Sequence, residues 1–166
     1  MTSHDSETPA VGHQVITATA VIHTKMSGKT FVFVPRRAKT KKFLPNVFEL
    51  PGGHVDFGES LIDGLKREIF EEFGMHVSVG DPVGAFTYLN DVKGSHSCEI
   101  VFFAQFLDDL DSISLREEDH SEFLWISKND IQLIYSSEKT EEDEEFQILS
   151  RAFSILDGAS PDFGNH

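Results

Sequence analysis

The chain has 166 residues, of which 39% are hydrophobic and 25% are charged, and its formal net charge is −14. This length suits a single compact domain. A chain so acidic is not expected to bind long DNA or RNA, because contacts between basic side chains and phosphates dominate that binding. No apolar run approaches the roughly 20 residues of a membrane-spanning helix, so no membrane partner is expected.

The cysteine count and the first residues bear on the cellular compartment. Cys98 is the only cysteine, so a disulfide within the chain is excluded. Residues 1–11 are polar and acidic and lack the basic start and apolar stretch of a signal peptide. These features favour a reducing, cytoplasmic setting.

Strand and helix patterns interleave along the chain. Apolar and β-branched runs predict strands at 15–24, 30–34, 77–79, 85–89, 99–106 and 123–126, with a short extended piece at 47–50. Pro35 is expected to end the second strand. Helices are predicted at 60–73 and 142–156, with a helical turn at 131–135. This order predicts an α/β (α+β) fold with a mixed sheet.

The two ends of the chain lack periodicity. We interpret residues 1–12 as a disordered tail and residues 158–166, which contain Gly, Pro and Asn, as a flexible C-terminal tail. Residues 13–157 then form the single domain.

The predicted helix 60–73 has one apolar and one acidic face. An apolar stripe for the core is formed at spacings of three and four by Ile62, Leu65, Ile69 and Phe73. On the other face, Glu68, Glu71 and Glu72 can point toward one neighbourhood. In an isolated helix each such pair of like charges costs about 0.2–0.5 kcal/mol, whereas a bound dication would make the arrangement favourable. On this fragment alone, a solvated acidic face is the commoner explanation.

The residues around this helix resemble the signature of the Nudix hydrolase family. That signature is Gly, five residues, Glu, seven residues, Arg-Glu, an aliphatic residue, any residue, Glu-Glu, any residue, Gly and an aliphatic residue. All of its fixed positions are filled over 23 residues, by Gly53, Glu59, Arg67, Glu68, Ile69, Glu71, Glu72, Gly74 and Met75. The resemblance implies the Nudix fold, in which a mixed sheet is sandwiched between helices (α/β/α). It also implies a pyrophosphohydrolase that cleaves a nucleoside diphosphate linked to another group and depends on Mg²⁺, with Mn²⁺ as a substitute.

The resemblance also implies roles for single residues. Metal ligands are expected at Glu68, Glu71, Glu72 and the carbonyl of Gly52. Glu59 and Arg67 would fix the preceding loop on the helix, because the Arg fork suits a carboxylate. Structural roles fall to Gly53, which allows a tight turn, and to Gly74, which suits the end of the helix.

The general base is left open. Glu68 or Glu71 could take the proton of the attacking water. The acidic loop 116–122 offers three further candidates, namely Glu118, Asp119 and Glu122. For each of these three, an ordinary solvated acid is the alternative.

Substrate contacts are expected on a basic loop that precedes the signature. Five of the chain's 14 basic residues lie within seven positions, at Arg36, Arg37, Lys39, Lys41 and Lys42. They could bind substrate phosphates or form an ordinary solvated loop. Arg36 and Arg37 are favoured because they end a strand just before the signature, and Leu50 is a further candidate. His54 and His120 are expected at the surface.

The substrate itself is also left open. Features of the coenzyme A, ADP-ribose and dinucleoside-polyphosphate branches are not found, which leaves the MutT-like branch and an oxidised or ordinary nucleoside triphosphate. A nucleotide-sugar or ADP-ribose-type pyrophosphatase is one alternative. A catalytically silent nucleotide-binding module is another. A homodimer would be common in this family.

Overall fold

The computed structural model describes residues 9–134 and 143–158. In chain order this part holds the following elements: β1 (Gln14–Met26), β2 (Lys29–Arg37), β3 (Gly52–His54), α1 (Leu61–Phe73), β4 (Val77–Asn90), β5 (Ser95–Phe106), the 3₁₀ helix η1 (Leu110–Ser112), β6 (His120–Ile126), the 3₁₀ helix η2 (Lys128–Ile134) and α2 (Glu144–Leu156). No helix in the described ranges is long and apolar enough to cross a membrane.

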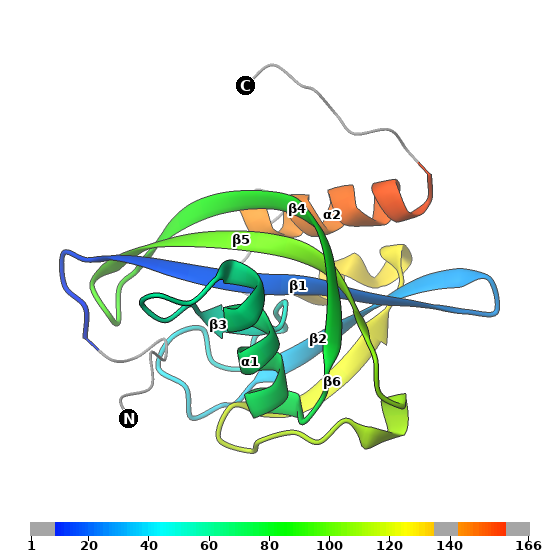
Figure 1. Ribbon diagram of the computed structural model, residues 1–166, viewed down its shortest axis with the longest axis horizontal. Helices are drawn as coiled ribbons and strands as arrows, with labels where there is room; N and C mark the ends of the chain where they lie inside the picture. The colour runs from blue at the N-terminus through cyan, green and yellow to red at the C-terminus, as the bar shows by residue number, and fades with distance from the viewer. Residues whose placement is uncertain (1–8, 135–142, 159–166) are drawn as a thin grey trace.

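The strands form one mixed sheet of six strands in the order β4-β5-β1-β2-β6, with β3 beside β1 (Figure 1). β1 runs parallel to β5, and the other pairs are antiparallel. β1 also changes partner along its length: Thr17–Thr19 pair with β3, whereas His23–Met26 pair with β2. The turn that leads into α1 is therefore anchored beside the middle of the sheet.

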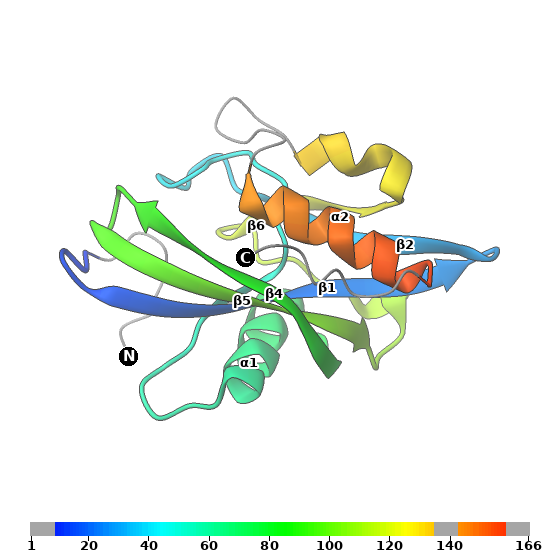
Figure 2. The ribbon, with the colours of Figure 1, turned by 90° about the horizontal axis from the view of Figure 1, so that it is seen from above.

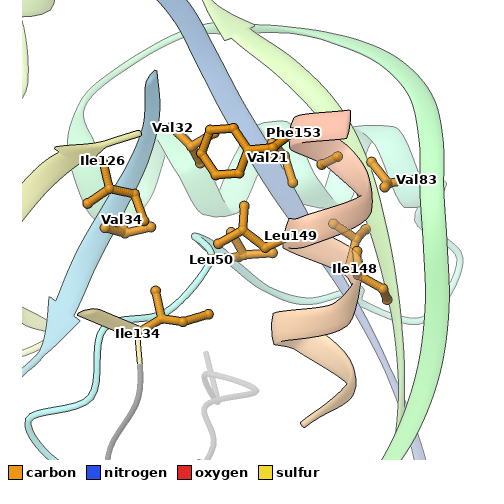
Figure 3. Packing of buried hydrophobic residues seen from close by; sticks show 12 residues of the cluster. Val21, Val32, Val34, Leu50, Val83, Ile126, Ile134, Ile148, Leu149 and Phe153 are labelled. Carbon is orange, nitrogen blue, oxygen red and sulfur yellow. The ribbon is translucent and has the colours of Figure 1, made fainter. Parts of the chain in front are cut away.

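The two long helices cover opposite faces of this sheet (Figure 2). Alternation along β1 sends Ala18 and Ala20 to the α1 side and Val21 to the α2 side. On the α1 side the core also contains Leu65, Ile69, Phe73, Phe33 and Phe102. On the α2 side, Figure 3 shows Leu149 and Phe153 of α2 pointing toward the strands, and both belong to one buried cluster with Val21 and Val34. The predicted α/β/α sandwich is confirmed.

Several predicted boundaries were wrong. β2 continues through Pro35. On the side of β2 where Pro35 lacks an N–H, the neighbour is the short segment 47–50, and the Pro35 carbonyl still accepts a hydrogen bond from the Glu49 N–H. The proline therefore removes only one hydrogen bond. The two strands predicted at 77–79 and 85–89 are one strand, β4, interrupted by bulges around Pro82. Ile62 is 40% exposed and does not belong to the core stripe.

The predicted tails lie largely outside the described residues, as do Tyr135 and Glu142. At residues 9–12 the chain is hydrogen-bonded to the turn between β4 and β5: Ala10 N–H donates to the Lys93 carbonyl and Gly12 N–H to the Gly94 carbonyl. α2 begins after Asp143, whose carboxylate accepts from the N–H groups of Glu145 and Phe146.

Candidate active site

Two adjacent glycines bring the backbone close to α1. Gly52 has φ +144°, and a Cβ there would lie 2.6 Å from the Thr19 Cα and closer still to the Ala18 carbonyl oxygen of β1. A Cβ on Gly53 would instead lie 2.5 Å from Glu68 Oε2. Gly52 therefore lets the turn rest on the sheet, and Gly53 leaves space for a carboxylate.

Arg67 ties the loop 52–60 to the helix. Its Nε lies 2.8 Å from Glu59 Oε2 and its Nη2 3.0 Å from Glu59 Oε1, and Nη2 also donates to the His54 carbonyl at 2.8 Å. This two-point fork is the geometry that arginine provides and lysine does not. The hydrogen bond from Arg67 holds the pKa of Glu59 below its usual value, and that bond raises the pKa of Arg67.

α1 carries the three carboxylates of the 23-residue signature, hereafter the box: Glu68, Glu71 and Glu72. Side-chain exposure is 14% for Glu68, 17% for Glu72 and 42% for Glu71. Arg67 Nη1 lies 3.0 Å from Glu68 Oε1 and 3.2 Å from Glu71 Oε2. Burial nevertheless raises the pKa of Glu68 to about 7. Burial, and then the neighbouring charges of Glu49 and Glu68, raise the pKa of Glu72 well above its usual value.

This arrangement fits a divalent cation. Among the described residues, the buried Oε2 of Glu72 has no hydrogen-bond partner, and a buried charged oxygen without a partner is unfavourable. A hard dication suits such carboxylate oxygens. In the described ranges no group of three or more Asp, Glu, His or Cys side chains has the geometry of a metal site. To bind a cation, Glu68 and Glu71 would have to release their hydrogen bonds to Arg67.

The three candidate bases of the loop 116–122 have different ion-pair partners, and only Asp119 is shown to lie near Glu72. Asp119 Oδ1 lies 3.0 Å from Lys41 Nζ, and its charge also raises the pKa of Glu72, so this residue lies near the box. Glu122 pairs with Arg36 at 3.4 Å, and Glu118 is an exposed side chain bound to Arg116.

The candidate substrate contacts are already engaged within the protein. Arg37 Nε donates to the Phe43 carbonyl at 2.9 Å, and its Nη1 lies 3.4 Å from Glu49 Oε1. Arg36 Nε donates to the Asn46 carbonyl at 2.9 Å. Leu50 is buried in the α2-side core, and its N–H donates to Glu145. Two ion pairs, Arg36–Glu122 and Lys41–Asp119, thus join the basic loop to the acidic loop.

Two histidines expected at the surface are buried, so that prediction was wrong: His54 is 8% exposed and His120 3%. His54 Nε2 lies 3.2 Å from Lys93 Nζ. His120 begins β6, and a bulge brings it to the α1 side. Arg36 pairs with Glu122 but Arg37 pairs with His120, so Ser121 is an extra residue in the strand.

Sequence reasoning missed Glu49 and the role of His120 in joining it to the box. His120 Nε2 lies 3.0 Å from Glu49 Oε2. The apolar alternation of Phe123 and Trp125 could have located the strand, but without the bulge it would have placed Ser121, not His120, on the α1 side. The pattern therefore held no signal for this contact.

Two surface hollows lie away from α1. One of about 340 Å³ lies between η2 and α2 and is lined by Lys128, Phe153 and Asp157, among others. It contains none of the box carboxylates. We place the site on α1 because it carries Glu72, whose buried carboxylate oxygen has no hydrogen-bond partner within the described residues, together with the charged network around it.

Known proteins have similar sequences and folds. The NUDIX domain family model matches residues 14–149. The human m7GpppN-mRNA hydrolase NUDT17 is 44% identical over 63 residues, which are 38% of this chain and 18% of that protein. The 8-oxo-dGTP diphosphatase of Buchnera aphidicola is 32% identical over 62 residues, 37% of this chain and 48% of that protein.

A solved structure shows the same fold. The MutT protein from Methanosarcina mazei has a TM-score of 0.66 at 24% identity and covers 92% of this chain and 99% of its own. The chain aligns with less than half of the length of these two relatives, so the similarity concerns the domain and not the whole protein. Since the family model spans residues 14–149, including the glycine turn, α1 and both loops around the site, the chain belongs to the Nudix family.

Proposed function

We propose that this Nudix domain is a pyrophosphohydrolase that cleaves a nucleoside diphosphate linked to a second group, and that Glu68, Glu71, Glu72 and the Gly52 carbonyl hold Mg²⁺. The observation that carries this proposal is the buried Glu72 Oε2, which has no hydrogen-bond partner among the described residues and lies beside two further carboxylates on α1. A solvated acidic face would not bury such an oxygen.

If Mg²⁺ is bound at these residues, it would neutralise negative charge on the substrate phosphates and lower the pKa of a bound water. The chain supplies the remaining parts. Arg67 keeps the glycine turn and the helix in one geometry through Glu59. Glu71, the most exposed of the three carboxylates, is best placed to accept the proton of the attacking water. Arg36 has 38% of its side chain exposed, against 12% for Arg37, so we expect Arg36 to contact substrate phosphates by exchanging Glu122.

For the second group we favour a nucleoside triphosphate substrate, oxidised or ordinary. The Buchnera relative's name supports this choice. Aromatic rings near the site could receive a base: Phe43 and Tyr88 lie nearly parallel, at 11° with centroids 6.1 Å apart, and Phe86 lies 5.9 Å from Tyr88. Trp125 does not belong to this group, because it packs against Phe33 in the α1-side core.

A second candidate substrate is a capped dinucleotide of the m7GpppN type. The 44% identity to the human cap hydrolase favours it. Both substrates contain the same phosphoric anhydride bond, so the site on α1 would act in the same way on either one. A nucleotide sugar or ADP-ribose would be handled by that site as well.

The test is turnover with Mg²⁺ on 8-oxo-dGTP, dGTP, a cap analogue, ADP-ribose and UDP-glucose, with the nucleoside mono- and diphosphate products separated by chromatography and measured, because only the triphosphates would release pyrophosphate or phosphate. We expect Mg²⁺-dependent turnover of at least one compound, lowered at least about 100-fold in Glu71→Gln, because proton transfer by a positioned side chain contributes that much. Glu144→Gln is the matched control, since Glu144 is an exposed glutamate at the start of α2, and it should keep the wild-type rate. Compounds that bind but are not turned over would instead identify a silent binding module.

A further inference from the structure

His120 occupies an unusual position for a polar side chain next to a metal-binding helix. It is the first residue of β6 and lies opposite Arg37, with only 4% of its side chain exposed. Its ring stacks on Phe73 of α1, with centroids 5.1 Å apart and planes inclined by 28°. The imidazole is therefore held between the sheet and the helix that carries the box carboxylates.

The two ring nitrogens of His120 face two different carboxylates. Nε2 lies 3.0 Å from Glu49 Oε2, which is hydrogen-bonding distance. Nδ1 faces Glu72 Oε2 across 3.9 Å. Glu49 is in turn paired with Arg37 at 3.4 Å. A row of polar side chains thus leads from Arg37 on β2, through Glu49 and His120, toward Glu72 on α1.

The last contact in this row is incomplete on both sides. Within the described residues, His120 Nδ1 and Glu72 Oε2 are both buried and neither has a hydrogen-bond partner. Buried polar atoms are normally paired, and leaving them unpaired is unfavourable. A movement of roughly 1 Å by either side chain would bring the two atoms to hydrogen-bonding distance. A carboxylate oxygen that accepts one hydrogen bond keeps a second lone pair, which a cation can bind.

We propose that His120 is a positioning residue that orients Glu72 for metal binding through a hydrogen bond between its Nδ1 and Glu72 Oε2, while Glu49 fixes the ring at Nε2. The inference rests on the proposed metal role of Glu72. A second carboxylate and a stacked ring limit the rotation of the imidazole, so the orientation of Glu72 is determined by groups outside the box. Such partners of a ligand commonly change metal affinity by about 10- to 100-fold when they are removed.

Two substitutions separate the two nitrogens. Asparagine places its amide at the position of Nδ1, and glutamine places its amide near the position of Nε2. We would titrate Mn²⁺ into the purified full chain without nucleotide and follow free Mn²⁺ by electron paramagnetic resonance. His120→Asn should bind Mn²⁺ within about twofold of wild type, whereas His120→Gln should bind it about tenfold more weakly.

Glu72→Gln distinguishes this inference from the proposed function. If Glu72→Gln weakens Mn²⁺ binding and His120→Gln does not, the positioning role is refuted and the metal site stands. Equal losses in His120→Asn and His120→Gln would assign the effect to ring packing, which also refutes the role. No loss in Glu72→Gln would refute the metal assignment itself. In the double variant His120→Gln/Glu72→Gln, we expect no loss beyond that of Glu72→Gln alone, because both substitutions remove the same interaction.

Discussion

Gly52 and Gly53 are adjacent in the chain but face different neighbours, one on the sheet and one on the helix. We predict that Gly52→Ala destabilises the fold by about 3 kcal/mol or more, because a Cβ would meet the backbone of β1 at a φ of +144°. Gly53→Ala should keep most of the stability, because its Cβ meets the Glu68 side chain rather than backbone, but it should weaken Mn²⁺ binding. Urea unfolding and Mn²⁺ titration of both variants measure these effects. Equal loss of stability in the two variants would contradict the assignment.

The buried carboxylates should make the metal-free protein less stable as pH rises. Burial raises the folded-state pKa of Glu68 to about 7 and shifts that of Glu72 in the same direction. The protonated carboxyl groups of Glu68 and Glu72 therefore contribute fully to the free energy of unfolding below the unfolded-state pKa of about 4.5. This contribution is lost as pH rises through the folded-state pKa. For Glu68 alone this amounts to at most about 3 kcal/mol.

Thermal unfolding in EDTA between pH 5 and pH 8 measures this effect. The melting temperature should fall across the window, and saturating Mg²⁺ should raise it more at pH 8 than at pH 5, because the ligands must be ionised to bind. Glu68→Gln cannot ionise and should show a shallower fall in EDTA. A slope equal to that of wild type would contradict the shifted pKa of Glu68.

The residue scale also shows what the sequence could and could not predict. The spacing of Glu68, Glu71 and Glu72 places them on one helix face, because helical periodicity is a local property. The neighbour of Glu72 across the core is not local. His120 reaches it only because Ser121 is bulged, and a single bulge reverses the parity on which strand patterns depend.

At the scale of elements, one side chain joins the loop 52–60 to α1. Arg67 makes two contacts with Glu59 and one with the His54 carbonyl. We predict that Arg67→Lys lowers the free energy of unfolding by about 1–3 kcal/mol, because an ammonium group cannot reach these acceptors together. Arg116→Lys is the control: Arg116 pairs at the surface, where ion pairs contribute about 1 kcal/mol or less. Urea unfolding that gave equal losses for the two variants would show that the fork is not needed.

The strand errors have a common cause at this scale. The sequence predicts that Pro35 ends a strand. In the structure Pro35 pairs with β6 on one side of β2 and has only a short irregular neighbour, residues 47–50, on the other. In β4, the bulges around Pro82 interrupt the alternation without ending the strand. Neither feature can be read from a single segment, because each depends on the partner that the segment meets in the sheet.

At the scale of the whole molecule, the sheet separates an α2-side core from an α1-side core, and of the two helices only α1 carries proposed metal ligands. Leu149 is fully buried on the α2 side, whereas the box carboxylates belong to α1 on the opposite face. We predict that Leu149→Ala lowers the free energy of unfolding by about 2–5 kcal/mol through loss of packing. Its Mn²⁺ affinity below the unfolding transition should equal that of wild type. A folded Leu149→Ala protein with weakened Mn²⁺ binding would show that the two faces are coupled.

The net charge of −14 also acts on the whole molecule, because it opposes the approach of any phosphorylated substrate. Arg36, Arg37 and Lys41 lie in ion pairs with acids of the protein. A bound divalent cation is then the main positive charge that the site can offer to a diphosphate. The account therefore depends on hydrolysis that requires this cation.

The most direct test is turnover of 8-oxo-dGTP, dGTP and a cap analogue with Mg²⁺ in water enriched in ¹⁸O, with the products analysed by mass spectrometry. Attack of water on phosphorus predicts one ¹⁸O atom in one phosphate-containing product per cleavage, with no cleavage when EDTA replaces Mg²⁺. Intact, unlabelled nucleotide in Mg²⁺, recovered from protein that binds it, would contradict the hydrolase.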